Sequence, residues 1–394
     1  MPSDDLDRRT FVGKTAAAGA ALTLGSLLQP STAATQADAT KKIRIGLIGC
    51  GSVSGAYLPH LSKCPYGEVV SLCDIKPERA ENRGNEFQIA NRYPHIKEML
   101  KGVEFDLLVN TTDMQEHEHL NREAIEAGKH VWSEKPIGNS VAGAQEVLAL
   151  AKSKGVRIWG APTAVNSPQF AFMAKALGAG KLGRVAAAHA DYGHEGPHWS
   201  SFFYEVGGGS LPDLGVYNIT SLTGLFGPAK SVVAMLNIVT PTRKIDGKGT
   251  IKVTEEDNAM LILDHGNGVL SHVQSGFNYF NPHGHDGSKE VRHTISMVGS
   301  HGFMGLVGYD WAPLAVDLAT MDAPEIKRNC DEPNDYVWQQ GASLVAETLA
   351  TGKETLFTPE HSIHVLDIIC AARESQKTGR RIDLTTSFKW PIVS

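Results

Sequence analysis

The sequence lacks any hydrophobic run long enough to cross a bilayer. Its 394 residues are 42% hydrophobic and 20% charged, and no apolar stretch reaches the roughly 18 residues that a spanning helix needs. Internal repeats are absent, and so are low-complexity segments after residue 34. This composition is ordinary for a globular chain, and it excludes collagen-like, coiled-coil and disordered proteins.

A basic cluster and a cysteine framework are also missing. The chain has 37 basic and 43 acidic residues and a formal charge of −6, so nucleic acid is not expected as a partner. Its five cysteines are odd in number and widely spaced, and no two form a C-x-x-C pair. This spacing excludes a disulfide framework and a cysteine zinc site, and by itself it indicates a cytoplasmic protein.

The first 34 residues indicate a different location. Arg8 and Arg9 precede a short apolar stretch from Thr15 to Leu28, and small residues follow from Ser31 to Ala34. This order is typical of a twin-arginine export signal, although an ordinary first helix that holds two arginines is the alternative. We therefore expect a periplasmic or otherwise exported protein that is handled by the twin-arginine machinery. Export after folding explains why the cysteines stay unpaired.

Residues 41–162 alternate strands and helices, which predicts a doubly wound parallel sheet. The length favours a second domain, over residues 163–380, and a short tail over 381–394. Residues 230–310 alternate β-rich runs with turns, as antiparallel hairpins do. Two amphipathic helices are expected near the C-terminus, over Asp335 to Thr351 and Pro359 to Lys377.

A glycine turn follows the first expected strand, Ile43 to Ile48. In Gly-Cys-Gly-Ser-Val-Ser, over residues 49–54, Gly49 allows a tight turn and Gly51 lets the backbone approach a pyrophosphate at a helix N-terminus. The third position of this fingerprint is Ser54 instead of Gly or Ala, which predicts slightly looser packing of the helix on the strand.

An acidic residue completes the expected dinucleotide site. Asp74 ends the second strand, 74 − 51 = 23 residues after Gly51. A carboxylate at this place accepts hydrogen bonds from both ribose hydroxyls, which favours NAD. Lys76 and Arg79 could attract a 2′-phosphate, so NADP stays open.

The segment Gly-Lys-His-Val-Trp-Ser-Glu-Lys-Pro, residues 128–136, resembles the signature of the glucose–fructose oxidoreductase, inositol dehydrogenase and rhizopine-catabolism (Gfo/Idh/MocA) family. A Gly-Gly-Gly-x-Leu-x-Asp-x-Gly segment at 207–215 adds to the resemblance. The family's fold is a Rossmann domain followed by an α/β domain with a large, mostly antiparallel sheet. Its members commonly assemble through that sheet, so a homo-oligomer is expected.

The resemblance also implies catalytic residues, namely Lys135, Asp213 and Tyr217. Lys135 ends a parallel strand and would hydrogen-bond a sugar hydroxyl. Asp213 and Tyr217 are four residues apart, so a helix starting there puts both on one face. Many members carry a histidine where this chain has Tyr217, and a phenol needs its pKa lowered from about 10 to act as a base. Helix capping by Asp213 and simple packing by Tyr217 are the alternatives.

The other candidate site residues fall into two groups. Cofactor contacts are expected from Gly49, Gly51, Ser52, Val53, Asp74, Asn110, Thr111, His117, Glu134 and Lys135. Substrate contacts are expected from Asn166, His194, His198 and Trp199, because histidine hydrogen bonds and a stacking tryptophan suit sugars. No metal is predicted, since a His-Gly-His-Asp segment at 283–286 offers no third ligand fixed by sequence.

These features predict an exported, NAD(P)-dependent oxidoreductase of a sugar or cyclic polyol. Because a freely dissociating cofactor would be lost outside the cytoplasm, we expect tight binding and internal recycling. An NAD-dependent glycoside-cleaving enzyme, which oxidises and then eliminates, needs the same residues and is the alternative. A non-catalytic sugar- or dinucleotide-binding protein is a third possibility.

Overall fold

The first part of the chain folds into a six-stranded parallel sheet in the computed structural model, which describes residues 41–283 and 287–393. The strands lie in the order β3-β2-β1-β4-β5-β6. They are β1 (Ile43–Ile48), β2 (Gly67–Cys73), β3 (Asn91–Tyr93), β4 (Leu107–Asn110), β5 (His130–Ser133) and β6 (Ile158–Gly160). The helices are α1 (Ser54–Leu61), α2 (Pro77–Glu86), α3 (Ile96–Lys101), α4 (His117–Glu126) and α5 (Val141–Ser153).

The order of these strands reverses between β1 and β4, which are neighbours in the sheet but not in the sequence. The connections leaving the two strands therefore go to opposite sides and leave a crevice at their carboxyl ends. Both strands are apolar and almost fully buried, as strands covered on both faces must be.

The second part of the chain forms a nine-stranded sheet. Its order is β16-β15-β14-β13-β7-β12-β11-β8-β17, and every pairing is antiparallel except β7 with β12. The strands are β7 (Val185–Gly193), β8 (Ser231–Asn237), β11 (Asn258–Asp264), β12 (Leu270–Gly276), β13 (His293–Gly299), β14 (Gly302–Tyr309), β15 (Ala312–Thr320), β16 (Ala323–Asn329) and β17 (Ile382–Asp383). A separate hairpin joins β9 (Thr242–Ile245) to β10 (Gly249–Lys252).

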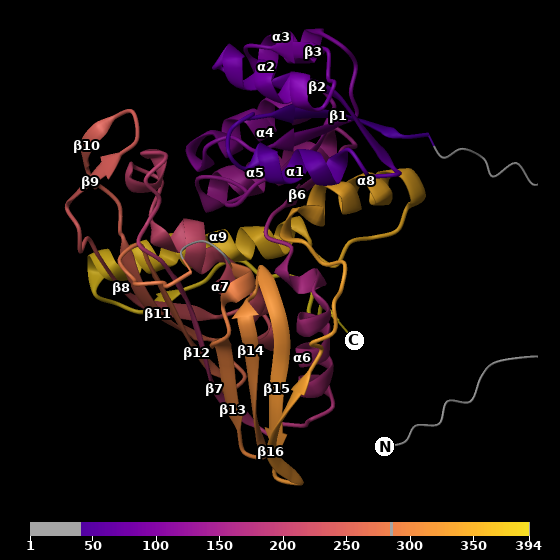
Figure 1. The fold of residues 1–394 in the computed structure, drawn as a ribbon. Helices are drawn as coiled ribbons and strands as arrows, with labels where there is room; N and C mark the ends of the chain where they lie inside the picture. Colours follow the sequence, from indigo (N-terminus) through magenta and orange to yellow (C-terminus); the bar gives the residue numbers. More distant parts are fainter. Residues whose placement is uncertain (1–40, 284–286, 394) are drawn as a thin grey trace, which may run out of the picture. The chain divides into compact units, whose positions relative to one another are not determined.

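Helices cover one face of this larger sheet. They are α6 (Pro168–Gly178), α7 (Val216–Phe226) and α9 (Pro359–Thr378), while α8 (Gly341–Thr351) returns to pack on α1, β1, β2 and β5 (Figure 1). Strand residues alternate between the two faces, and the face away from the helices exposes apolar side chains such as Val233, Met260 and Ile262. The sheet is therefore open on one side.

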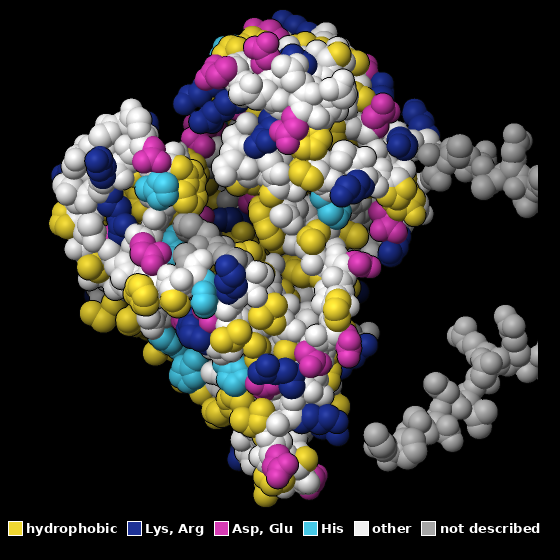
Figure 2. All heavy atoms as spheres, viewed as in Figure 1, with side chains coloured by type: hydrophobic (Ala, Val, Ile, Leu, Met, Phe, Trp, Pro, Cys, Tyr) yellow, Lys and Arg dark blue, Asp and Glu magenta, His cyan; other side chains and the backbone are white. Residues whose placement is uncertain are grey.

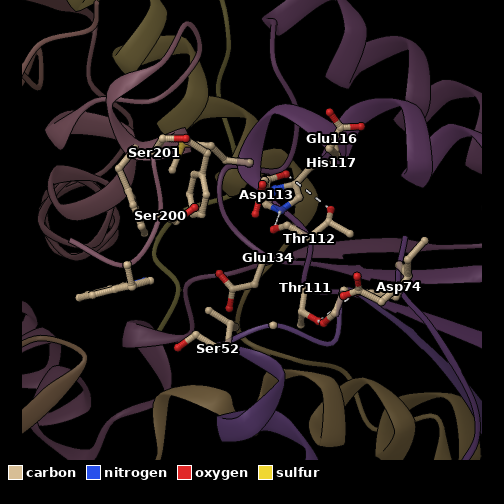
Figure 3. Close-up of a pocket in the computed structure, with 18 of the residues that line it drawn as sticks. Ser52, Asp74, Thr111, Thr112, Asp113, Glu116, His117, Glu134, Ser200 and Ser201 are labelled. Atoms are coloured by element: carbon tan, nitrogen blue, oxygen red, sulfur yellow. Dashed lines mark hydrogen bonds between the residues drawn. The ribbon is translucent and has the colours of Figure 1, made fainter. Parts of the chain in front are cut away.

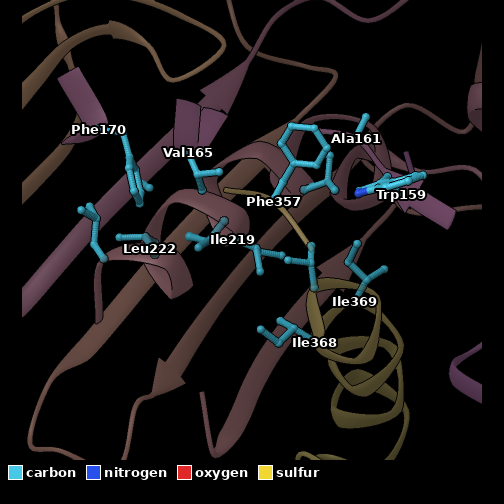
Figure 4. Packing of buried hydrophobic residues seen from close by; sticks show 14 of the residues in the cluster. Trp159, Ala161, Val165, Phe170, Ile219, Leu222, Phe357, Ile368 and Ile369 are labelled. Carbon is cyan, nitrogen blue, oxygen red and sulfur yellow. The ribbon is translucent and has the colours of Figure 1, made fainter. Parts of the chain in front are cut away.

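A continuous apolar core joins the two sheets. Trp159 and Ala161, at the end of β6, pack in one cluster with Val165, Leu222 and Ile369 from the second domain (Figure 4). Burying each large aliphatic side chain stabilises the fold by about 1.5–3 kcal/mol. This shared core fixes how the edge of the first sheet faces the second domain.

The expected fold class is confirmed, with local differences. Helix α8 begins at Gly341 and not at Asp335, because the preceding segment is extended and crosses α1, where the Trp338 ring meets Tyr57 edge-on. Residues expected as a tail add the edge strand β17 to β8. The proposed export signal lies outside the described residues. Of the helices that the structure describes, none combines the length and the apolar character needed to cross a membrane.

Candidate active site

A cleft of about 1140 Å³ runs along the carboxyl ends of the parallel strands (Figure 3). Its walls combine the first domain with three parts of the second, which are the loop 194–205, the segment 213–217 and the tip of the β9–β10 hairpin. In the space-filling view it is the hollow between the upper domain and the lobe beside it (Figure 2). Open α/β sheets bind ligands at this place.

The glycine turn gives the cleft a backbone floor. Gly49 has φ of 91°, and a Cβ added there would lie 2.6 Å from the backbone of Thr111. At Gly51 an added Cβ would meet, among described residues, only an Arg79 nitrogen, 3.4 Å away. The space over Gly51, next to the first turn of α1, therefore fits the diphosphate of a dinucleotide.

The serine at the third fingerprint position tightens the turn. Ser54 is fully buried and its hydroxyl donates to the Gly51 carbonyl at 2.7 Å. This hydrogen bond lies within the turn, so the looser packing of the helix on the strand stays a prediction. Ser52 and Val53 line the cleft as expected.

Asp74 is held in place by backbone amides. Its Oδ2 accepts from the Cys50 amide at 2.7 Å and its Oδ1 from the Lys76 amide at 2.8 Å. A carboxylate has about four acceptor positions, so acceptor capacity remains on the side that lines the cleft. Lys76 and Arg79 line the same end, and their positive charge keeps a 2′-phosphate compatible with the site.

Asn110 and His117, two of the expected cofactor contacts, use their polar side-chain atoms on protein partners. Asn110 is fully buried and does not line the cleft, because its amide donates to Asn121 and its oxygen accepts from the Thr112 hydroxyl. His117 reaches the cleft wall, but its two ring nitrogens lie 2.8 Å and 3.0 Å from the carbonyl oxygens of Pro136 and Thr112. Burial lowers the His117 pKa. Thr111 lines the cleft and ties β4 to the glycine turn.

Glu134 is part of a buried hydrogen-bond network that the sequence did not reveal. The Tyr57 hydroxyl on α1 donates to Glu134 Oε1 at 2.7 Å and accepts from the Trp132 indole at 3.2 Å. Glu134 Oε2 accepts from the Lys135 amide at 3.0 Å. Burial raises the pKa of Tyr57 well above its usual value, and the negative charge of Glu134 raises it further. A tyrosine inside an apolar helix gives no sequence signal for this role.

Lys135 and Asp213 meet across the cleft. The Lys135 Nζ lies 2.6 Å from Asp213 Oδ1 and 2.8 Å from the Asp213 carbonyl oxygen, and both side chains are about nine-tenths buried. The Tyr217 ring centre is 5.3 Å from the same nitrogen. Asp213 lies on a π-helical turn, Leu211–Gly215, and Tyr217 on the α-helix that follows. Both line the cleft.

The environment of Tyr217 does not lower its pKa. Burial raises the pKa well above 10, and the negative charge of Glu134 adds to the effect. The phenol is therefore protonated at neutral pH in this structure. Tyr217 is suited to donating a hydrogen bond or a proton, not to acting as a ready base.

The structure brings only two of the four expected substrate residues to the cleft. His194 and Trp199 line it, with Trp199 41% exposed. His194 Nδ1 accepts from the Gly196 amide at 3.0 Å, which leaves the ring hydrogen on Nε2. His198 turns outward to Asp246, 2.9 Å away, and Asn166 lies on a turn before α6, away from the cleft. Sequence order placed them correctly near strand ends but could not give their direction.

The sequence also missed residues that join the two walls. Gln115 donates to the carbonyl oxygens of Phe202 and Val206, at 2.9 and 3.2 Å. Lys248 at the hairpin tip donates to the Ser201 hydroxyl and lies 3.8 Å from Glu205. A turn signal around Gly247 and Gly249 exists in the sequence, but nothing there shows that this hairpin reaches the cleft.

Within residues 41–283 and 287–393, no group of three or more histidine, cysteine, aspartate or glutamate side chains is arranged to hold a metal ion. Most of the His-Gly-His-Asp segment, residues 284–286, lies outside that part. All five cysteines are free thiols.

Several characterised enzymes are similar to this chain in sequence. Trans-1,2-dihydrobenzene-1,2-diol dehydrogenase of Mus musculus is 27% identical over 224 residues, 56% of this chain and 64% of the mouse enzyme. The match thus spans less than two thirds of that enzyme. The 1,5-anhydro-D-fructose reductase of Ensifer adhaerens is 27% identical over 267 residues, 64% of this chain and 77% of the reductase.

A solved structure shares the fold. The aldose-aldose oxidoreductase of Caulobacter crescentus, complexed with glycerol, superimposes with a TM-score of 0.73 at 21% identity, covering 87% of this chain and 100% of that one. An oxidoreductase family model with an NAD-binding Rossmann fold matches residues 43–161, and a GFO/IDH/MocA C-terminal domain model matches residues 170–304. The two models follow the two sheets, and the chain belongs to the Gfo/Idh/MocA oxidoreductase family.

Proposed function

We propose that this protein is a nicotinamide-dependent oxidoreductase that acts on a sugar or a cyclic polyol. The observation that carries the proposal is the Lys135–Asp213 ion pair, with the Tyr217 ring beside it, at the end of β5. The glycine turn and Asp74 lie in the same cleft. The names of the relatives, which include an anhydrofructose reductase and an aldose-aldose oxidoreductase, support a carbohydrate substrate.

The chemistry follows from the hydrogen-bond capacity of Lys135. When bound, the dinucleotide supplies a hydride acceptor or donor for a carbinol carbon. The Lys135 ammonium has three N–H donors, and Asp213 accepts two of them. The third can hydrogen-bond the substrate oxygen and stabilise the negative charge that develops as the hydroxyl proton leaves. Asp213 thereby aims the ammonium.

Tyr217 is the second group that can handle the substrate proton. Its pKa is raised by burial, so it carries its proton at neutral pH. In reduction, a protonated phenol can give that proton to the new alkoxide. In oxidation of the same substrate the hydroxyl proton returns to the phenol oxygen by the reverse of that step, while the Lys135 ammonium stabilises the oxygen that the proton leaves.

The second-domain wall suits a sugar. The Trp199 ring is 41% exposed in the cleft wall and packs edge-on against Phe203, and an indole can stack on the apolar face of a pyranose or cyclitol. The His194 imidazole lines the same wall and adds a polar ring that suits sugar hydroxyls. Together they offer one stacking surface and one polar group.

We also propose that the protein is exported with its cofactor already bound. The arginine pair, apolar stretch and small residues of the first 34 positions support export. Outside the cytoplasm a tightly held nicotinamide would be recycled by a second half-reaction in the same cleft. The name of the Caulobacter enzyme, which pairs two aldoses, is consistent with such recycling.

Assembly into a homo-oligomer through the open face of the nine-stranded sheet is part of the same proposal. Six apolar side chains on that face are 44–77% exposed, and a second copy would remove them from water. They are Val233, Met235, Met260, Ile262, Leu270 and Val298.

One set of measurements tests the proposal. The purified mature chain is denatured and assayed for released nicotinamide, and the native chain is titrated with sugars while cofactor reduction is followed. We expect bound nicotinamide, turnover of at least one sugar, and no turnover by Lys135→Ala. Lys129→Ala is the matched control, because Lys129 pairs with Glu104 at the other end of β5.

Each alternative has its own outcome. No released nicotinamide would contradict tight binding, and full activity of Lys135→Ala would contradict the catalytic assignment. Aglycone release from aryl glycosides without added cofactor would instead indicate glycoside cleavage by transient oxidation.

A further inference from the structure

Two histidines face each other on the open face of the large sheet. His189 on β7 and His272 on β12 are directly paired in the parallel register, and their ring centres are 5.9 Å apart. Figure 2 shows histidine side chains gathered on the visible face of the second domain, where β7, β12 and β13 run in Figure 1. The proposed oxidoreductase chemistry uses neither ring.

We propose that His189 and His272 form half of a divalent transition-metal site that a second copy of the chain completes with the same two side chains. This inference rests on the proposed assembly through the open sheet face. Imidazole nitrogen is a preferred ligand of zinc, and four such ligands make a closed tetrahedral site.

The spacing of the two rings suits one metal ion. With Zn–N bonds of about 2.0–2.1 Å, two imidazoles on the same tetrahedral ion have ring centres about 5 Å apart. The observed distance of 5.9 Å between the ring centres is close to that value.

A single copy does not supply enough ligands. Asp191 lies on the same face, two residues after His189, but its carboxylate pairs with Arg292 at 2.7 Å. Among the described residues no group of three metal-binding side chains occurs. The site of one chain is therefore incomplete, and the remaining ligands have to come from outside it.

The position of the pair makes a second copy the natural source. β7 is the fifth of nine strands, and His189 is the fifth of its nine residues, so the pair lies near the centre of the sheet face. In a two-fold assembly, residues near the axis meet their own copies. Val233 and Ile262 continue the same cross-strand row on one side and supply apolar contact around the polar centre.

The test uses the untagged mature chain, freed of metal by a chelator, with zinc as the probe. Titration calorimetry gives affinity and stoichiometry, and sedimentation velocity gives the assembly state with and without zinc. We expect one zinc per two chains and a shift towards the larger species when zinc is added. His189→Asn or His272→Asn should weaken binding by at least about tenfold, the lower range for disturbing a metal site, and should abolish the shift.

His301→Asn is the matched control, because that exposed imidazole lies at the β13–β14 turn and contacts Ser300. It should bind zinc like the unaltered chain. Binding that survives the double substitution of His189 and His272 would overturn the site. One zinc per chain with no change in assembly would overturn sharing between copies. Because neither readout involves a sugar or nicotinamide, failure here is distinguishable from failure of the proposed oxidoreductase activity.

Discussion

The Lys135 ammonium on the first domain lies 2.6 Å from the Asp213 carboxylate on the second. This contact joins the end of a parallel strand to a π-helical turn 78 residues later in the chain. Because each group is about nine-tenths buried, neither has water as an easy replacement partner. The pair both closes the back of the cleft and orients the one Lys135 donor left for a substrate.

Removing the charge of Asp213 should impair catalysis more than binding. Asp213→Asn keeps the size of the side chain but loses the ion pair, so kcat should fall by roughly 10²–10⁴-fold, the usual range for a displaced proton-transfer group. Steady-state kinetics with the preferred sugar measure the effect. Asp383→Asn, which disturbs an exposed contact with Arg381 on the edge strand β17, is the control. An unchanged kcat would show that Lys135 is positioned without its partner.

Tyr217 should contribute no basic group in the neutral range. Burial and the charge of Glu134 raise the pKa of Tyr217 above about 10. Below that pH, the pH–rate profiles of the unaltered chain and of Tyr217→Phe should therefore have the same shape. The same substitution should lower kcat/KM for oxidation and reduction of one sugar by the same factor, because the group that donates the proton in reduction accepts it in oxidation. A limb near neutral pH that disappears in Tyr217→Phe would contradict the protonated phenol.

Substitution of the two glycines of the turn should have different effects, one on dinucleotide affinity and the other on the stability of the fold. Gly51→Ala adds a Cβ into open cleft, so the fold should keep its melting temperature while dinucleotide affinity, measured by calorimetry, drops. Gly49→Ala is strained at φ of 91° and meets the Thr111 backbone, which should destabilise the fold by at least about 1–2 kcal/mol. If both variants melt alike, the division of roles between the glycines is wrong.

Tyr57 should act on the cleft through Glu134. Tyr57→Phe removes a buried donor at 2.7 Å, and the loss should cost about 1–3 kcal/mol of stability because the carboxylate loses a partner. A double-mutant cycle with Glu134→Gln isolates the coupling between the two groups. Tyr66→Phe, at a half-buried position, provides the background effect of losing a phenol. If the two substitutions change the free energy of unfolding additively, Tyr57 and Glu134 are not coupled.

Acid should destabilise the second domain through buried histidines. Burial lowers the pKa of His361 to about 3 and that of His364 to about 4. The folded chain keeps them neutral, whereas the unfolded chain binds protons below about pH 6.5. The free energy of unfolding should therefore be highest above that pH and fall as the pH drops towards 4.

Thermal unfolding across this pH range checks the prediction. His361→Gln should flatten the decline, and His119→Gln, at an exposed position on α4, should leave it unchanged. A melting temperature that rises on acidification would contradict the assignment.

Much of the first domain could be read from the order of residues. Apolar runs of four to six residues, a glycine turn directly after one of them, and Asp74 after the next are local patterns, and local backbone preferences suffice to produce them. The same holds for Lys135, because a residue that ends a parallel strand must come to the sheet edge where ligands bind.

Side-chain direction was decided by packing between distant segments. Asn110 and Asn166 also follow strand or domain junctions, yet Asn110 turns to Asn121 and Asn166 lies away from the cleft. The His198 ring contacts the carboxylate of Asp246, which lies 48 residues later on the β9–β10 hairpin. No pattern within a few residues can specify such a choice, because it depends on which surface the second domain brings alongside.

The sequence by itself determined the family and the dinucleotide turn and supplied the candidate residues Lys135, Asp213 and Tyr217, since each depends on short segments whose chemistry is local. Only the tertiary structure decided the protonation of Tyr217, the role of Tyr57 and the pairing of His189 with His272. Those three depend on burial and on neighbours from other strands or helices, which set the local dielectric and the available partners.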